Sequence, residues 1–96
     1  MSINNPTHQL HLLIQGSVQG VFFRTNTRRK ASELGLTGWV KNLPDGQVEC
    51  LVQGEKENLQ NLLKWCWSSP GYSDVRDIQS TWQEPAEIFS MFRIVH

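Results

Sequence analysis

A glycine-bracketed loop that ends in an arginine is the stretch of this sequence best suited to chemistry. It runs from Gly16 to Arg24 as GSVQGVFFR, between an apolar run at Leu10–Ile14 and a segment of helical spacing after Phe23. We expect the loop to join a strand to the N-terminus of a helix, where backbone N–H groups are unpaired and the helix dipole adds partial positive charge. Because converging amides of this kind bind phosphate, the loop predicts a phosphate cradle.

Arg24 stands where a cation is locally unfavourable. In the first turn of a helix a positive side chain opposes the dipole by about 0.3 to 1 kcal/mol unless an anion is bound nearby. A guanidinium can donate two parallel hydrogen bonds to one edge of a phosphate, which an ammonium cannot do. Two alternatives stay open from this stretch alone. Arg24 can be a solvated surface residue, and Gly16 and Gly20 can serve only to make the turn.

A second segment, from Gly38 to Gly54, reads GWVKNLPDGQVECLVQG. Together with GSVQGVFFR it resembles the two signature motifs of the acylphosphatase family. In that family the first motif has the form GxVQGVxFR, and the second places an asparagine before a glycine-bearing hairpin. The resemblance extends from about Leu10 to the C-terminus. It implies an enzyme that hydrolyses the carboxyl–phosphate bond of small acyl phosphates to carboxylate and inorganic phosphate.

The resemblance also implies a role for each residue of the site. Arg24 becomes the residue that binds phosphate, and Asn42 the residue that orients the attacking water. The cradle is implied to consist of backbone amides, those of Ser17, Val18, Gln19, Gly20, Val21 and Phe22. Two of these positions depart from the family pattern, because many relatives carry a basic residue in place of Ser17 and a glycine in place of Phe22. We expect Ser17 to affect a supplementary charge only, and Phe22 the width of the site mouth.

Two other interpretations compete with this one. Asn42 can be the initiator of the Pro-Asp-Gly turn that follows it. The whole domain can be a regulatory module that binds a small anion without turnover. An RNA-binding sheet would need a basic surface, whereas nine Lys plus Arg balance nine Asp plus Glu to a formal net charge of +0. We therefore expect a local anion site and no nucleic-acid or membrane partner.

Length and composition predict one small domain. The chain has 96 residues, enough for a single core, with a polar extension expected over about residues 1–9. Since no apolar stretch is typical of a signal peptide or a membrane span, we expect a cytoplasmic monomer. Cys50 and Cys66 form no CxxC pair and the three histidines are scattered, so we expect no metal and no cofactor. Both cysteines are predicted to be small buried hydrophobes, with a disulfide between them as the alternative.

The order of elements predicts an α+β fold. A helix after Phe23 should end at a left-handed Gly35, and a second should bury the apolar stripe of Leu59, Leu62, Leu63 and Cys66. Strands are expected at Leu10–Ile14, Leu36–Lys41, Val48–Val52, Val75–Gln83 and Phe89–Val95. This is the βαββαβ order of a ferredoxin-like split sandwich, with two helices on one face of an antiparallel or mixed sheet and an extra C-terminal strand. The pattern leaves open which closing strand forms the edge of the sheet.

Overall fold

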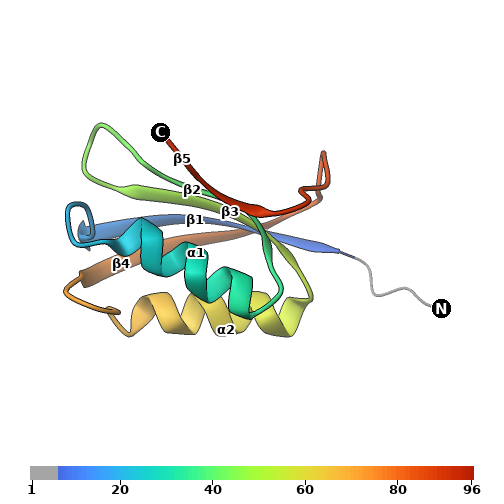
Figure 1. Ribbon diagram of the computed structural model, residues 1–96, viewed down its shortest axis with the longest axis horizontal. Coiled ribbons are helices and arrows are strands. Elements are labelled where there is room, and N and C mark those ends of the chain that lie inside the picture. The colour runs from blue at the N-terminus through green and yellow to red at the C-terminus, as the bar shows by residue number, and fades with distance from the viewer. Residues whose placement is uncertain (1–6) are drawn as a thin grey trace.

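A computed structural model describes residues 7–96, and within them the helices and strands follow the predicted order (Figure 1). Residues 1–6, which belong to the expected polar extension, lie outside the described part. The elements are β1 (His8–Ser17), α1 (Phe23–Glu33), β2 (Thr37–Asn42), β3 (Val48–Gly54), α2 (Lys56–Trp67), β4 (Asp74–Gln83) and β5 (Phe92–Val95). No helix in this range is long and apolar enough to cross a membrane.

The strands form one sheet in the order β4-β1-β3-β2-β5, and both helices pack on the same face of it (Figure 1). The pairs β1/β3, β1/β4 and β2/β3 are antiparallel, and β5 joins β2 in parallel. The α+β, ferredoxin-like prediction is therefore confirmed. The order also answers the question left open by the sequence, because the two closing strands β4 and β5 occupy the two opposite edges.

The core lies between the central strands and the helices. Facing pairs on β1 and β3 have no exposed surface, namely Leu10 with Val52, Leu12 with Cys50, and Ile14 with Val48. Burial of each aliphatic side chain of this size contributes about 1.5 to 3 kcal/mol relative to exposure. The helices close the core with Phe23, Thr27 and Ala31 of α1 and with Leu59, Leu62 and Cys66 of α2.

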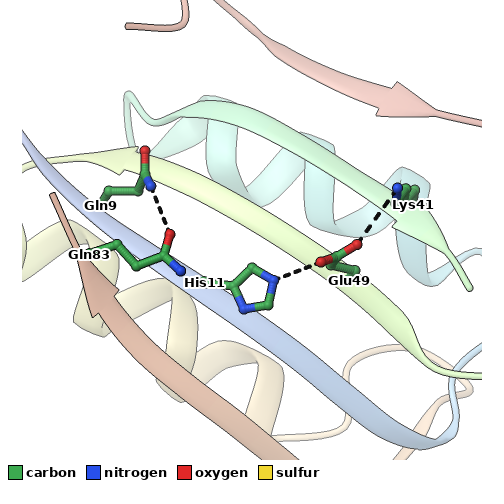
Figure 2. Close-up of polar contacts among 5 residues, drawn as sticks. All are labelled: Gln9, His11, Lys41, Glu49 and Gln83. Carbon is green, nitrogen blue, oxygen red and sulfur yellow. Dashed lines mark hydrogen bonds and ion pairs between the residues drawn. The ribbon is translucent and has the colours of Figure 1, made fainter. Parts of the chain in front are cut away.

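Buried glutamines account for two of the strand boundaries that the sequence misplaced. β1 begins at His8 rather than Leu10, and Gln9 is only 6% exposed. Its side-chain amide donates to Gln83 Oε1 (Figure 2) and its Oε1 accepts from Gln53 Nε2, each at 2.8 Å. Hydrogen bonds to the side-chain amides of the buried Gln53 and the exposed Gln83 replace the apolar contact on which the prediction relied.

Gln53 also explains why the last strand is shorter than expected. Its Nε2 donates to the carbonyl of Glu87 at 2.7 Å, and its Oε1 accepts from the backbone N–H of Phe89 at 3.0 Å. Phe89 is thus bound to a side chain rather than to a neighbouring strand. The predicted strand over Phe89–Val95 forms its ladder with β2 only from Phe92.

The two cysteines are free and buried, so the disulfide alternative is wrong and the expectation of small buried hydrophobes is confirmed. Burial raises the pKa of the Cys66 thiol to about 12, and it raises the pKa of Cys50 well above its ordinary value. Both side chains are therefore neutral thiols near pH 7 and are poor nucleophiles.

We expect substitution of Gly16 to disrupt the bend that leads β1 into the site. The pairing of β1 with β4 shifts register between Gln15 and Gly16, and a Cβ on Gly16 (φ 129°) would overlap the carbonyl oxygen of Asp74. Gly35 (φ 71°) ends α1, and a Cβ added there would have nothing within 4 Å of it. Gly35→Ala should lower the free energy of unfolding by about 1 kcal/mol, the cost of a left-handed alanine.

Gly16→Ala should cost at least twice as much as Gly35→Ala in urea denaturation, because the backbone of β4 must move as well. Equal losses in the two variants would show that the close approach to Asp74 is unimportant for stability.

Candidate active site

A cleft of about 220 Å³ lies between the loop that follows β1 and the end of β2. It brings together Arg24 and Asn42, the two side chains that the sequence singled out. Its lining consists of Val18, Gly20, Phe22, Phe23, Arg24, Thr25 and Asn42. Of the predicted cradle, Val18, Gly20 and Phe22 line the cleft, whereas Ser17, Gln19 and Val21 do not. Ser17 lies at the end of β1 opposite Asp74. The phosphate-binding role of all six amides stays a prediction.

The start of α1 presents unpaired donors to this cleft. Phe22 is the N-cap residue, and its side chain makes no capping hydrogen bond. Within residues 7–96 no backbone or side-chain acceptor takes the amide hydrogens from Gln19 to Thr25. The first turn also contains no acidic residue, although it contains Arg24. Donors, dipole and guanidinium therefore all favour an anion at this point.

The second helix begins differently. Glu57 occupies the first turn of α2 and Lys64 its last turn, so its own charges complement its dipole. In α1 only the C-terminal end has a side chain whose charge complements the dipole, namely Lys30. Of the four ends of the two described helices, the N-terminus of α1, at the cleft, is the one without a complementary charge.

The side chain of Gln19 joins the loop to the β2–β3 hairpin. Its Nε2 donates to the carbonyl of Leu43 at 2.9 Å and to the carbonyl of Gln47 at 2.8 Å. Figure 1 shows the two loops side by side at the same end of the sheet. From the sequence, only the main-chain amide of Gln19 was predicted to belong to the site, because the carbonyls that its side chain binds belong to a distant segment. The signal that could have indicated a side-chain role was a long amide side chain placed between small and apolar residues.

The hairpin that carries Asn42 is closed by its own bonds. Leu43 donates to the carbonyl of Gln47 at 2.8 Å, and Asp45 Oδ1 accepts from the backbone N–H of Gln47 at 3.0 Å. The latter bond is the main reason that the pKa of the Asp45 carboxyl is lowered. The side chain of Asn42 makes no hydrogen bond to any described residue. Asp45, rather than Asn42, thus supplies the side-chain contact of the turn, and Asn42 is available to a ligand.

The opposite face of the same sheet holds a separate polar cluster. His11 Nε2 lies 2.7 Å from Glu49 Oε2, and Lys41 Nζ lies 3.7 Å from Glu49 Oε1 (Figure 2). Lys41 neighbours Asn42 in β2, and successive residues of a strand point to opposite faces. The ammonium of Lys41 therefore belongs to this cluster and not to the cleft.

A wider groove of about 580 Å³ continues from the cleft and shares Arg24 and Thr25 with it. Arg28, one turn further along α1, and Arg93 of β5 also line it. No carboxylate of a described Asp or Glu side chain lies within 4.0 Å of these three arginines. Arg24 Nη1 approaches His96 Nδ1 at 3.4 Å. The mouth of the site is thus locally positive although the whole chain is neutral.

The sequence also matches a known protein family. The family model described as Acylphosphatase matches residues 10–94, nearly the whole chain. The chain belongs to the acylphosphatase family. A curated acylphosphatase from Nitrosococcus oceani is 54% identical over 82 residues, covering 85% of this chain and 91% of the relative. The resemblance inferred from the two motifs is confirmed, and the chain is an acylphosphatase enzyme.

Solved acylphosphatases have the same fold. The structure from Coxiella burnetii is 40% identical with a TM-score of 0.87 and covers 93% of each chain. That from Bacillus subtilis is 36% identical with a TM-score of 0.89, covering 93% of this chain and 99% of its own. Acylphosphatases act on small acyl phosphates.

We expect loss of the Gln19 bridge to impair turnover without removing any group of the cleft. Gln19→Glu keeps the shape of the side chain but places a carboxylate, which cannot donate, against the two carbonyls of the hairpin. Turnover of acetyl phosphate should fall at least about tenfold, because small displacements of reacting groups are costly. The free energy of unfolding should fall by about 1 to 3 kcal/mol.

Gln60→Glu on the exposed face of α2 is the matched control and should change neither quantity appreciably. Full activity in Gln19→Glu would show that the bridge does not position the loop.

Proposed function

We propose that Arg24 and the amides at the start of α1 bind the phosphoryl group of an acyl phosphate, and that Asn42 orients the water that attacks it. The observation that supports this proposal is the meeting of these three kinds of group at one cleft. Without a ligand, each of them lacks a hydrogen-bond acceptor or an anionic partner among residues 7–96. A bound phosphoryl group would supply both.

The reaction requires mainly positioning and charge stabilisation. An acyl phosphate is a mixed anhydride whose carboxylate leaves readily, so the leaving group needs little assistance. The amides from Gln19 to Thr25 would hold the phosphoryl oxygens, and the guanidinium of Arg24 would donate two parallel hydrogen bonds to another edge. Donors fixed before the reaction stabilise the charge as it redistributes during in-line displacement.

Asn42 is proposed to place water opposite the leaving carboxylate. The water oxygen forms a new bond to phosphorus, and the bond from phosphorus to the carboxyl oxygen breaks with its electron pair on the carboxylate. An amide takes up no proton at neutral pH, so Asn42 is not the general base. The proton passes to the phosphate product or to solvent. Every group that this scheme uses belongs to the chain itself.

We propose that the enzyme works as a monomer in the cytoplasm. All the residues that line the cleft come from a single chain, so the site needs no second subunit. The buried free thiols of Cys50 and Cys66 suit a reducing compartment.

Arg24→Lys should greatly reduce turnover, because lysine keeps the positive charge but lacks the planar pair of donors. We expect kcat/KM for acetyl phosphate to fall by about a hundredfold or more. Inhibition by inorganic phosphate should weaken in parallel. Arg29→Lys, on the exposed side of the same helix, is the control and should keep wild-type kinetics. Near-normal turnover in Arg24→Lys would remove Arg24 from the phosphate site.

Asn42→Ala should separate catalysis from binding. If the amide orients water and barely touches the phosphoryl group, kcat should fall by about a hundredfold while the inhibition constant of phosphate stays within about threefold. Thermal stability should change little, since the side chain has no hydrogen-bond partner among residues 7–96. Asn61→Ala on α2 controls for loss of an exposed amide. An Asn42→Ala protein with nearly intact kcat but lower stability would show that Asn42 acts only in the turn.

A further inference from the structure

Phe22 adopts a backbone conformation that bulky residues rarely occupy. Its dihedral angles are φ 61° and ψ 23°, in the left-handed region that glycine occupies without steric cost. Its ring is 77% exposed to solvent. An aromatic residue that is both strained and exposed weakens the fold at this position. Local strain of this kind marks places where function, rather than stability, decides the residue.

Nothing in the described part of the protein compensates for this strain. Phe22 is absent from the buried core and from the partly buried side chains that pack against it, and its ring pairs with no other described aromatic ring. Ser69 (φ 54°) is the other described non-glycine residue of positive φ. The Ser69 hydroxyl accepts a hydrogen bond from the backbone N–H of Val75 at 2.9 Å. The side chain of Ser69 therefore has a structural role, whereas Phe22 contributes to the start of α1 only through its backbone, whose carbonyl accepts from the N–H of Asn26 at 3.0 Å.

The position of Phe22 in the cleft indicates a role for its ring in binding substrate. Phe22 lines the same cleft as Arg24 and Asn42, directly before the first turn of α1. When a phosphoryl group occupies the amides of that turn, the acyl group bonded to it must extend from the bottom of the cleft toward solvent. Because Phe22 lines the cleft and is largely exposed, its ring is available to that acyl group. An apolar acyl group lying against it would remove apolar surface of both partners from water.

We infer that Phe22 is a specificity-determining residue, which packs against the acyl group and selects acyl phosphates with an aromatic acyl group over acetyl phosphate. This inference rests on the proposed placement of the phosphoryl group. The main competitor is the adjoining groove with Arg28 and Arg93, which would instead favour an acyl group that carries a second negative charge.

The test compares benzoyl phosphate with acetyl phosphate as substrates of wild type, Phe22→Gly and Phe22→Ala. Both variants remove the ring, but only glycine also relieves the backbone strain. We expect the ratio of kcat/KM for benzoyl phosphate to kcat/KM for acetyl phosphate to fall about tenfold in both variants. The melting temperature of Phe22→Gly should rise above that of wild type by about 4 °C, whereas that of Phe22→Ala should not.

A control variant removes an exposed aromatic ring at the other end of β1. Trp82 packs there against His8, so Trp82→Ala should leave the ratio of the two substrates unchanged. Inhibition by phenylphosphonate and by inorganic phosphate gives a readout that needs no turnover. The affinity for phenylphosphonate relative to that for phosphate should fall about tenfold in both Phe22 variants.

Different results would contradict the role of Phe22 and the proposed placement of the phosphoryl group. An unchanged ratio of benzoyl to acetyl phosphate in both variants would overturn the role of Phe22 alone. A loss that is equal for both substrates would also overturn it, because the ring would then shape the cradle rather than read the acyl group. A wild-type preference for succinyl phosphate over benzoyl phosphate would assign selection to the arginine groove. If instead Arg24→Lys left turnover and phosphate inhibition intact, the proposed site itself would fail.

Discussion

The bridge from Gln19 to the β2–β3 hairpin is the constraint on which the cleft depends. The donors of the cradle follow β1, whereas Asn42 ends β2, and β3 lies between these strands in the sheet. A contact across that gap helps to fix one group relative to the other, in addition to the pairing of both strands with β3. The two hydrogen bonds from Gln19 Nε2, to the carbonyls of Leu43 and Gln47, make that contact from within the cradle itself. A loop held in this way can keep its amides aimed at one point.

Stability elsewhere permits the strained and unpaired features at this end of the sheet. The facing pairs of β1 and β3 are fully buried, and the Gln9–Gln53–Gln83 network fixes the opposite end of the sheet. At the end of the sheet that carries the cleft, the amides that begin α1 have no side-chain cap, the charge of Arg24 opposes the helix dipole, and Phe22 has left-handed dihedral angles. Each of these lowers stability by an amount that a well-packed core can tolerate, and each has a use once an acyl phosphate is bound.

Regular periodicity made most of the fold predictable. The alternation of Val48, Cys50 and Val52 and the helical spacing of Leu59, Leu62 and Cys66 identified β3 and α2 and the faces that they bury. Prediction was wrong where polar side chains are buried against one another, as at Gln9, because the sequence of one strand does not show its hydrogen-bond partners. Phe89 was misassigned for the same reason.

The residues of the site, like the elements of the fold, were predicted only in part. Arg24 and Asn42 could be named from two short motifs, and the structure places them in one cleft. The side chain of Gln19 was missed, since its acceptors are main-chain carbonyls of another element. The left-handed conformation of Phe22 was also invisible, because a dihedral angle depends on how the loop is closed.

The most direct test of the account is a titration of the protein with inorganic phosphate followed in amide proton–nitrogen correlation spectra. The account predicts that the amide signals from Gln19 to Thr25 shift together and saturate with one dissociation constant. The guanidinium signal of Arg24 should follow the same curve. Saturable shifts confined to Arg28, Arg93 and their neighbours, with the signals from Gln19 to Thr25 unmoved, would contradict it.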